Sequence, residues 1–326
     1  MTVFFIVLRQ ICMMALLIAV GWFLARKGIL TKDGNAQLSF ILTSVIVPSV
    51  IFCAFLSLDA SLDGLQQLGT TFALCFGSFL FAMLVAVLLA RKGDRDAQAV
   101  TRTGLVFTNN GFFGIPLSQA LFGEIGVFYA SINVLCANLL MWTWGYAQYG
   151  VGQRGVKGML RQPTVAAGLL GLAVFLLRLC PLTAPLFAAA WFTAVTQPLN
   201  SALETLKSMN TPVAMLILGV NVYNAGWKPD RRILRDVPVM ALRQILIPLA
   251  WLALTVWLPT ERTLIFSVFL EATCPVALMI SVLSARSNAS PAQQERSTRL
   301  VVLSTLSALV TVPLMVALGD LICPLG

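Results

Sequence analysis

Apolar runs of about 20 residues follow one another along the whole chain, and this recurrence limits the fold to one class. A helix of ~20 apolar residues is long enough to cross the ~30 Å hydrocarbon core of a bilayer. The composition agrees, since 58% of the residues are hydrophobic, 11% are charged and the mean hydropathy is +0.87. Backbone polar groups in lipid must be paired within their own segment, so the runs predict helices. The sequence therefore predicts an all-α polytopic membrane protein surrounded by the lipid bilayer.

We place ten transmembrane helices along the chain. The first run is followed by Arg26-Lys27 and no basic region precedes it, the reverse of a signal peptide, so we keep it as a span. A shorter apolar segment at 184–197 fits an interfacial helix. The predicted spans cover residues 3–25, 37–57, 67–90, 99–121, 125–148, 163–180, 200–222, 237–257, 262–285 and 296–318.

Basic residues collect in alternate connections between these spans. The odd-numbered connections hold 17 of the 22 lysines and arginines, whereas acidic residues dominate the even-numbered ones. Because Lys and Arg collect on the cytoplasmic side, we predict a multi-pass protein of the cytoplasmic membrane with both termini outside. The net charge of +9 then reflects topology, and no nucleic-acid partner is expected. The basic residues of the odd connections are Arg26, Lys27, Lys32, Arg91, Lys92, Arg95, Arg102, Arg154, Lys157, Arg161, Lys228, Arg231, Arg232, Arg235, Arg286, Arg296 and Arg299.

The fourth predicted span contains a run that disfavours continuous helix, TNNGFFGIP at residues 108–116. Its glycines and proline loosen the backbone, and its amides need partners that lipid cannot supply. Interrupted helices in transporters mark the substrate site, especially when both halves of the chain have one. The second candidate is EATCP at residues 271–275 in the ninth span. We expect the two breaks to meet near the bilayer midplane.

The prolines also repeat in register between the two halves. Pro48 and Pro116 lie on the second and fourth spans, 68 residues apart, and Pro212 and Pro275 lie on the seventh and ninth, 63 residues apart. A repeat of five spans is inverted, because an odd number of crossings reverses the direction of the chain. We therefore expect a first repeat at residues 1–149 and a second, inverted repeat at 163–326.

Five residues at the two breaks are candidates for binding a substrate. They are Asn109, Asn110, Gly111 and Pro116 at the first break and Pro275 at the second. Amide groups at an unwound segment can bind an anion or ion directly. The alternative role for the asparagines is interhelical hydrogen bonding. A second group, placed at about the same depth and expected to line a polar cavity or to pack, comprises Asn133, Asn138, Pro48, Ser49 and Pro212.

Glu271 is the only acidic residue that we place deep within a span, four residues before Pro275. Inserting an ionised carboxylate at this depth costs about 2.5–3.5 kcal/mol, so such residues are by default functional hypotheses. Glu271 is therefore the candidate for ion coupling, and a structural pair with a basic residue is the alternative. Arg243 in the eighth span is better explained by snorkelling toward the headgroups. Glu204 and Lys207, three residues apart, are expected to pair locally.

Three segments together resemble the auxin efflux carrier family, which includes plant auxin exporters and bacterial carriers often labelled malonate transporters. They are the run from Asn109 to Leu117, the proline-containing IVPSVIF at 46–52 and STLSALVTVPL at 304–314. The resemblance covers essentially the whole chain. It implies two inverted five-helix repeats whose helices 4 and 9 are broken and cross. It also implies a scaffold of helices 1, 2, 6 and 7 that can form a homodimer, and a moving transport domain of helices 3–5 and 8–10.

The resemblance also assigns residue roles. Asn109, seven residues before Pro116, matches the crossover asparagine that contacts substrate in the plant members. Glu271 is more similar to the cation-site glutamate of bile acid sodium symporters than to the apolar crossover of plant exporters. The connection at 149–162 is short, so regulation through a long phosphorylated loop is not implied.

These observations predict a secondary active transporter that moves a small organic anion, a carboxylate, across the cytoplasmic membrane by alternating access. The alternative is a monovalent cation/proton exchanger that uses Glu271. An enzyme is disfavoured, because the sequence has no histidine, no second deep carboxylate and no nucleophile with a base nearby. No cofactor is expected apart from Na⁺ or H⁺ as a coupling ion. The seven cysteines lie mostly in apolar runs without a C-x-x-C pair, so no metal site is expected.

Overall fold

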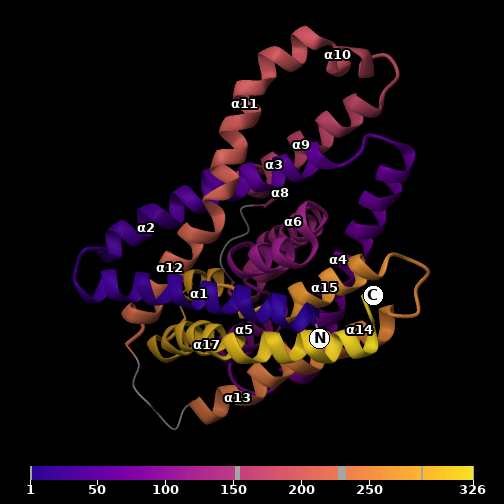
Figure 1. The fold of residues 1–326 in the computed structure, drawn as a ribbon. Helices are drawn as coiled ribbons and strands as arrows, with labels where there is room; N and C mark the ends of the chain where they lie inside the picture. Colours follow the sequence, from indigo (N-terminus) through magenta and orange to yellow (C-terminus); the bar gives the residue numbers. More distant parts are fainter. Residues whose placement is uncertain (1, 151–154, 227–232, 288, 326) are drawn as a thin grey trace.

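A computed structural model describes residues 2–150, 155–226, 233–287 and 289–325, and over these ranges the chain is helical apart from its connections and one isolated β-bridge (Figure 1). Within the same ranges, 6 helical stretches are long and apolar enough to cross a membrane. The all-helical, multi-pass membrane class predicted from the sequence is therefore supported. The six stretches are Val3–Arg26, Lys32–Ser57, Leu62–Leu89, Asn110–Gln148, Ile233–Thr255 and Pro291–Ile322.

The helices follow the apolar runs, with four π-helical turns (η) inserted among them. The first half of the chain forms α1 (Thr2–Arg26), α2 (Lys32–Ile41), η1 (Leu42–Ile46), α3 (Val47–Ser57), α4 (Leu62–Leu89), α5 (Arg95–Val106), η2 (Asn110–Gly114), α6 (Ile115–Leu140), η3 (Met141–Gly145) and α7 (Tyr146–Gln148). The second half forms α8 (Gly155–Leu160), α9 (Pro163–Leu179), α10 (Ala184–Ala188), α11 (Ala190–Ser208), α12 (Asn210–Asn224), α13 (Ile233–Ala241), η4 (Leu242–Leu246), α14 (Ile247–Thr255), α15 (Arg262–Thr273), α16 (Met279–Arg286) and α17 (Pro291–Ile322).

Three of the π turns end two residues before a proline, and the prolines explain them. Pro48, Pro116 and Pro248 follow η1, η2 and η4 in this way. A proline ring inside a helix clashes with the carbonyl four residues earlier, and its nitrogen cannot donate a hydrogen bond. A wider turn just upstream moves that carbonyl aside and lets the chain stay helical.

The chain bends sharply at Gly123, which lies between the fourth and fifth predicted spans. Gly123 has φ 63° and ψ −141° inside α6. This backbone conformation favours glycine, because a Cβ is strained at positive φ. A kink at one glycine therefore separates the two helical parts of α6, where the sequence predicts a connection between two spans.

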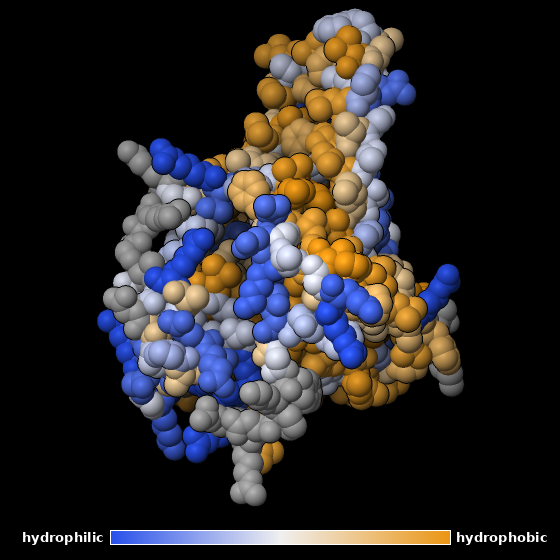
Figure 2. Space-filling model, turned by 90° about the vertical axis from the view of Figure 1, so that its left-hand side faces the viewer, coloured by the Kyte–Doolittle hydropathy of each residue, from blue (hydrophilic) through white to orange (hydrophobic). Residues whose placement is uncertain are grey.

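The interfacial helix predicted at 184–197 is wrong in its extent. α11 runs without interruption from Ala190 to Ser208 and contains Pro198 in its interior, and only Met209 separates it from α12. No residue of α11 is buried. Together with α9 and α10 it forms an arm that rises from the body in Figure 1, and the same arm is largely hydrophobic in Figure 2. The helical segment predicted from residue 200 therefore begins ten residues earlier, at Ala190, because the helix tolerates Pro198.

Glycines allow two helices of the body to touch along their backbones. A Cβ added at Gly21 of α1 would lie 2.3 Å from the Leu216 carbonyl oxygen of α12, and one at Gly219 of α12 would lie 2.1 Å from the Ile18 oxygen. Small residues at such contacts bring membrane helices close enough for extensive van der Waals packing. The α1–α12 pair is therefore fixed by two reciprocal glycine contacts.

Hydrophilic side chains gather over the end of the molecule at which α1 joins α2 and α13 begins, the face turned to the viewer in Figure 2. Near this end Asp236 is fully buried and accepts bonds from Arg296 Nε and Arg299 Nε, each at 2.9 Å. The N- and C-termini lie together away from this end (Figure 1). Four predicted cytoplasmic residues, Arg154, Lys228, Arg231 and Arg232, lie outside the described residues.

Candidate functional site

The two predicted breaks lie against each other. The first, expected at residues 108–116, is confined to 107–109 between α5 and η2, because Asn110–Gly114 form the π turn and Pro116 lies in the first turn of α6. The second, expected at 271–275, covers 274–278 between α15 and α16, because Glu271 and Ala272 are still helical. Thr108 and Val276 form an antiparallel β-bridge, Asn109 N–H donates to the Pro275 carbonyl at 2.7 Å and Ala277 N–H donates to the Phe107 carbonyl at 3.0 Å. Each break thus supplies hydrogen-bond partners for the other, which is how extended backbone is tolerated inside a helical membrane protein.

Four helix ends meet at this crossover. α5 and α15 end there with their carbonyl groups, and η2 and α16 begin there with their N–H groups. Helix N-termini carry partial positive charge and C-termini carry partial negative charge. The crossover therefore offers sites for both an anion and a cation before any side chain is counted.

The two asparagines of the first break differ in what they bind. Asn110 Nδ2 donates to Asn133 Oδ1 at 2.7 Å, and Asn110 Oδ1 accepts from Gly111 N–H at 3.0 Å, so this side chain is held by its neighbours. Asn109 is buried, and its Nδ2 has no hydrogen-bond partner among the described residues. Asn109 is therefore the amide with a donor available, whereas Asn110 and Asn133 link α6 to the break.

Glu271, on the last turn of α15, is 1% exposed. Its Oε1 accepts a hydrogen bond from Ser118 Oγ at 2.9 Å, and its Oε2 has no partner in the described part of the chain. A Cβ added at Gly114 would lie 2.0 Å from Glu271 Oε2. Gly114 is thus the residue that lets the carboxylate lie against the start of α6, and the carboxylate retains a free oxygen.

Arg243 corrects the sequence-based interpretation. It does not reach toward the headgroups, because it is only 2% exposed and its Nη1 donates to the Ala272 carbonyl of α15 at 2.9 Å. Its Nε has no partner among the described residues. Arg243 lies in η4, which packs against α5 and α15 beside the crossover. An arginine that faces the interior of a helical bundle is a functional candidate, and its place within an apolar run was the signal for it.

The neighbouring Gln244 is equally buried and joins η4 to α17. Its Nε2 donates to the Ser304 carbonyl at 2.9 Å, and its Oε1 accepts from Ser307 Oγ at 2.7 Å. Ser304 Oγ in turn accepts from Val276 N–H at 3.0 Å. The serines of the motif at 304–314 therefore hold the second break in place.

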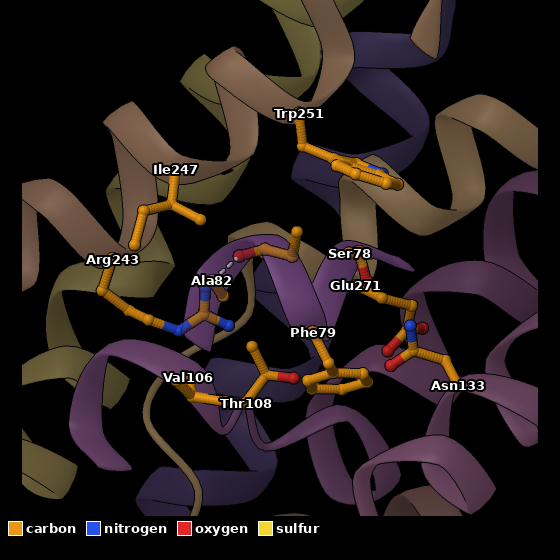
Figure 3. A pocket seen from close by; sticks show the side chains of 11 residues that line it. Ser78, Phe79, Ala82, Val106, Thr108, Asn133, Arg243, Ile247, Trp251 and Glu271 are labelled. Atoms are coloured by element: carbon orange, nitrogen blue, oxygen red, sulfur yellow. Dashed lines mark hydrogen bonds between the residues drawn. The ribbon is translucent and has the colours of Figure 1, made fainter. Parts of the chain in front are cut away.

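A cavity separates Arg243 from Glu271 (Figure 3). The guanidinium enters from one side, whereas the carboxylate lies on the other beside the Asn133 amide, and Thr108 and Phe79 lie between them in this view. No ion pair joins the two charges in the described residues. As it stands the cavity has room for about one water molecule. It is lined by Ser78, Phe79, Ala82, Val106, Thr108, Asn133, Arg243, Ile247, Trp251, Glu271 and Ala272.

The structure brings most of the predicted site residues to the crossover, but not all. Pro116 is buried just after η2, and Gln10 Nε2 of α1 donates to its carbonyl at 3.3 Å. Ser49 Oγ and Asn138 Nδ2 instead donate to carbonyls of their own helices, those of Val45 and Val134, each at 2.8 Å.

Two predicted prolines are not among the residues that line the cavity. Pro48 is half-buried on α3 and Pro212 is exposed on α12. From α12 it is Asn210, through Nδ2, that reaches the Gly111 carbonyl at 3.4 Å. Sequence reasoning did not assign site roles to Arg243, Thr108, Ser118 and Gly114.

The site offers no set of metal ligands. Among the described residues there is no group of three or more Cys, Asp or Glu side chains that could hold a metal ion. The free Glu271 oxygen is a different case, since a single carboxylate oxygen can accept a proton or contribute one ligand to a monovalent cation.

The known proteins to which this chain is similar are described as transporters. A family model described as "Membrane transport protein" matches residues 6–158 and 152–316. An "Uncharacterized transporter" of Methanothermobacter thermautotrophicus is 25% identical over 306 residues, 91% of this chain and 93% of the relative. A second "Uncharacterized transporter", from Methanocaldococcus jannaschii, is 22% identical over 215 residues, 64% of this chain and 66% of the relative. The chain belongs to the membrane transport protein family, the auxin efflux carrier family that its motifs resemble.

Proposed function

We propose that this membrane transporter is a secondary carrier that moves a small organic anion across the cytoplasmic membrane by alternating access at the crossover. The observation that carries the proposal is the pair of interleaved breaks, joined by the hydrogen bond from Asn109 N–H to the Pro275 carbonyl at 2.7 Å. Discontinuous helices that meet in this way form the substrate sites of many secondary transporters. The free Asn109 amide supplies a donor for an anionic group.

The proposed architecture is ten membrane passages in two inverted repeats, residues 1–149 and 163–326, with both termini outside. In its support, each predicted span overlaps a helix or a broken helix pair of the described chain. The antiparallel bridge between the two breaks is the arrangement expected of segments that an inverted repeat relates. On this proposal α1–α3 and α9–α12 form the scaffold, and the remaining helices form the moving transport domain.

A homodimer through the scaffold belongs to the same proposal. It is supported by the apolar side chains that the arm exposes, among them Trp191, Val195 and Leu199, at 62%, 72% and 59% exposure. Exposed apolar surface of this extent faces either lipid or another protein chain. Cross-linking in native membranes distinguishes these two environments.

The second candidate function is a monovalent cation/proton exchanger. It rests on Glu271, whose Oε2 is buried without a partner among the described residues. A Na⁺ ion or a proton bound there would neutralise the carboxylate and remove the cost of burying its charge. Vesicles that exchange Na⁺ for H⁺ in the absence of any organic anion would favour this function over the first.

The test of the carrier function is thermal unfolding of purified protein with a panel of monocarboxylates, dicarboxylates and indole acids, with and without Na⁺. A ligand at 100 times its Kd raises the free energy of unfolding by about 2.7 kcal/mol if it binds only the folded state. Compounds that stabilise the protein are then tested for uptake into proteoliposomes. A protein that binds and transports none of them while exchanging cations is not an anion carrier.

Asn109→Ala is the matched variant for this assay, and Asn138→Ala is its control. Both remove an amide, but Asn138 donates to the Val134 carbonyl of its own helix at 2.8 Å. We expect Asn109→Ala to reduce uptake at least tenfold with little loss of stability, and Asn138→Ala to transport normally. Equal transport by the two variants would show that the Asn109 amide serves packing and does not bind the substrate.

A further inference from the structure

We propose that Arg243 is the residue that binds the carboxylate of the substrate, with the Thr108 hydroxyl as a second donor, and that the cavity selects small monocarboxylates over dicarboxylates. The proposal rests on the proposed anion carrier and names its specificity. It starts from a charge that the rest of the described chain leaves without a counter-ion.

The first step is the burial of the Arg243 guanidinium. The side chain is 2% exposed, and the described residues place no carboxylate within ion-pair distance of it. Guanidinium groups stay charged in proteins, and a buried charge without a partner is costly. The buried carboxylate of Asp236, by contrast, has its counter-ions within the same molecule, because two arginines pair with it. The missing counter-ion of Arg243 is therefore expected to be a ligand.

The second step is the geometry of the donors. Arg243 Nη1 donates a hydrogen bond to the Ala272 carbonyl, whereas Arg243 Nε is buried and has no partner among the described residues. Arginine binds carboxylates through two parallel N–H groups, and the Nε–Nη2 edge is one such pair. Thr108 Oγ1 is also buried and without a partner among the described residues, and it belongs to the same cavity. In Figure 3 the Thr108 hydroxyl lies between the guanidinium and Glu271.

The third step is the charge balance of the lining. Arg243 is the single basic residue and Glu271 the single acidic one among the eleven lining residues of this described cavity. One carboxylate satisfies the arginine. A second carboxylate on the same small molecule would face the apolar side chains of Phe79, Ile247 and Trp251, or the like charge of Glu271. The same apolar side chains provide contact for a hydrocarbon body.

The fourth step concerns access. The cavity has room for about one water molecule, so a carboxylate with a hydrocarbon body enters only when the surrounding helices separate. Arg243 is on η4 and Thr108 is on the first break, so both donors belong to elements next to the crossover. The binding pocket is thus expected to open and close with the alternating-access movement.

A purely structural role for Arg243 makes a different prediction. Ala272 is in the last turn of α15, and a donor at its carbonyl caps the C-terminus of that helix. Arg178 does the same elsewhere, since its Nη1 donates to the Leu56 carbonyl in the last turn of α3 at 2.8 Å. Arg178→Gln is therefore the matched control for Arg243→Gln, because each variant removes a charge and leaves an amide that can still donate.

The experiment uses the full chain in proteoliposomes and in detergent, with butyrate and phenylacetate as monocarboxylates, malonate and succinate as dicarboxylates, and butyramide as a neutral analogue. We expect monocarboxylates to stabilise the parent and to be transported at least tenfold more efficiently than dicarboxylates, and butyramide to do neither. Arg243→Gln should lose this binding, Arg243→Lys should weaken it at least tenfold, and Arg178→Gln should retain it.

The outcomes separate the two proposals. Monocarboxylate binding retained by Arg243→Gln overturns the role of Arg243, and dicarboxylates bound as tightly as monocarboxylates overturn the selectivity, while the anion-carrier function stands in both cases. If the parent binds and transports none of these anions and none of the indole acids, while it exchanges cations, the carrier function itself fails. Arg243→Lys keeps the charge and a donor for Ala272, so it remains informative if Arg243→Gln does not fold.

Discussion

Replacing Glu271 by glutamine tests whether the carboxylate couples ion binding to transport. In the parent, Ser118 Oγ lies 2.9 Å from Glu271 Oε1. The substitution preserves the shape of the side chain and one acceptor oxygen for this hydroxyl, but removes the exchangeable charge. If a Na⁺ ion or a proton binds at the free oxygen, the variant no longer responds to its gradient. We expect driven accumulation of the substrate to be lost, whereas passive exchange of substrate persists.

The structure gives the expected effect on stability. The variant weakens one hydrogen bond, from about 1.5–3 kcal/mol for a charged acceptor to about 0.5–1.5 kcal/mol for a neutral one. It also removes the cost of holding an ionised carboxylate at this depth, about 2.5–3.5 kcal/mol. These effects oppose each other, so the free energy of unfolding should change by less than about 2 kcal/mol. A carboxylate in a structural ion pair would instead cost about 3–5 kcal/mol when it is removed.

The assay compares uptake by the parent and by Glu271→Gln in proteoliposomes at matched protein density, with and without an imposed Na⁺ or pH gradient. Thermal unfolding of both forms is measured in parallel. Accumulation by the glutamine variant that follows the gradient as it does in the parent would refute the coupling role. A loss of about 3 kcal/mol or more in stability, with coupling intact, would assign Glu271 to structure instead.

Two further predictions concern space at the crossover and orientation in the membrane. Gly114→Ala should abolish coupled transport, because its Cβ would lie 2.0 Å from Glu271 Oε2. Gly104→Ala should transport normally in the same uptake assay, because its Cβ would meet only a Leu300 side-chain carbon, at 3.8 Å. A cysteine at exposed Asp63 should react with an impermeant thiol reagent added outside and one at exposed Arg161 should not, and the reverse labelling would invert the topology.

The helices could be predicted well from the sequence, because the signal for them is local. Hydrophobic runs long enough to cross a bilayer mark their own positions, and the observed helices overlap the predicted ranges. A break in this segment could also be predicted, but it was predicted too long, because the π turn η2 and the first turn of α6 accommodate the glycines and Pro116 as helix. The continuous α11 was missed because the segment at 184–197 and the span from residue 200 were predicted as separate helices, although a helix can keep Pro198 in its interior.

The candidate site could be predicted only in part, because its polar groups are paired by residues far apart in the chain. Asn109 and Asn110 are adjacent, yet the Asn110 amide is hydrogen-bonded to Asn133, whereas the Asn109 amide has a free donor among the described residues. A single sequence does not indicate which of the two asparagines keeps a free donor. Arg243 was misassigned for the same reason, since its depth in the span allows either snorkelling or burial, and only packing against α15 decides between them.

On the two proposals together, Arg243 and Glu271 would give one cavity a site for an anion and a site for a coupling cation. Each is buried and lacks a counter-ion among the described residues, and they face the cavity from opposite sides without forming an ion pair (Figure 3). If only one of the two were neutralised, the other charge would remain buried at a cost when the cavity closes. Closure is therefore most favourable with both sites loaded or with both charges free to approach each other. On these proposals coupling would follow from the electrostatics of one closed cavity, without a longer-range pathway between separate sites.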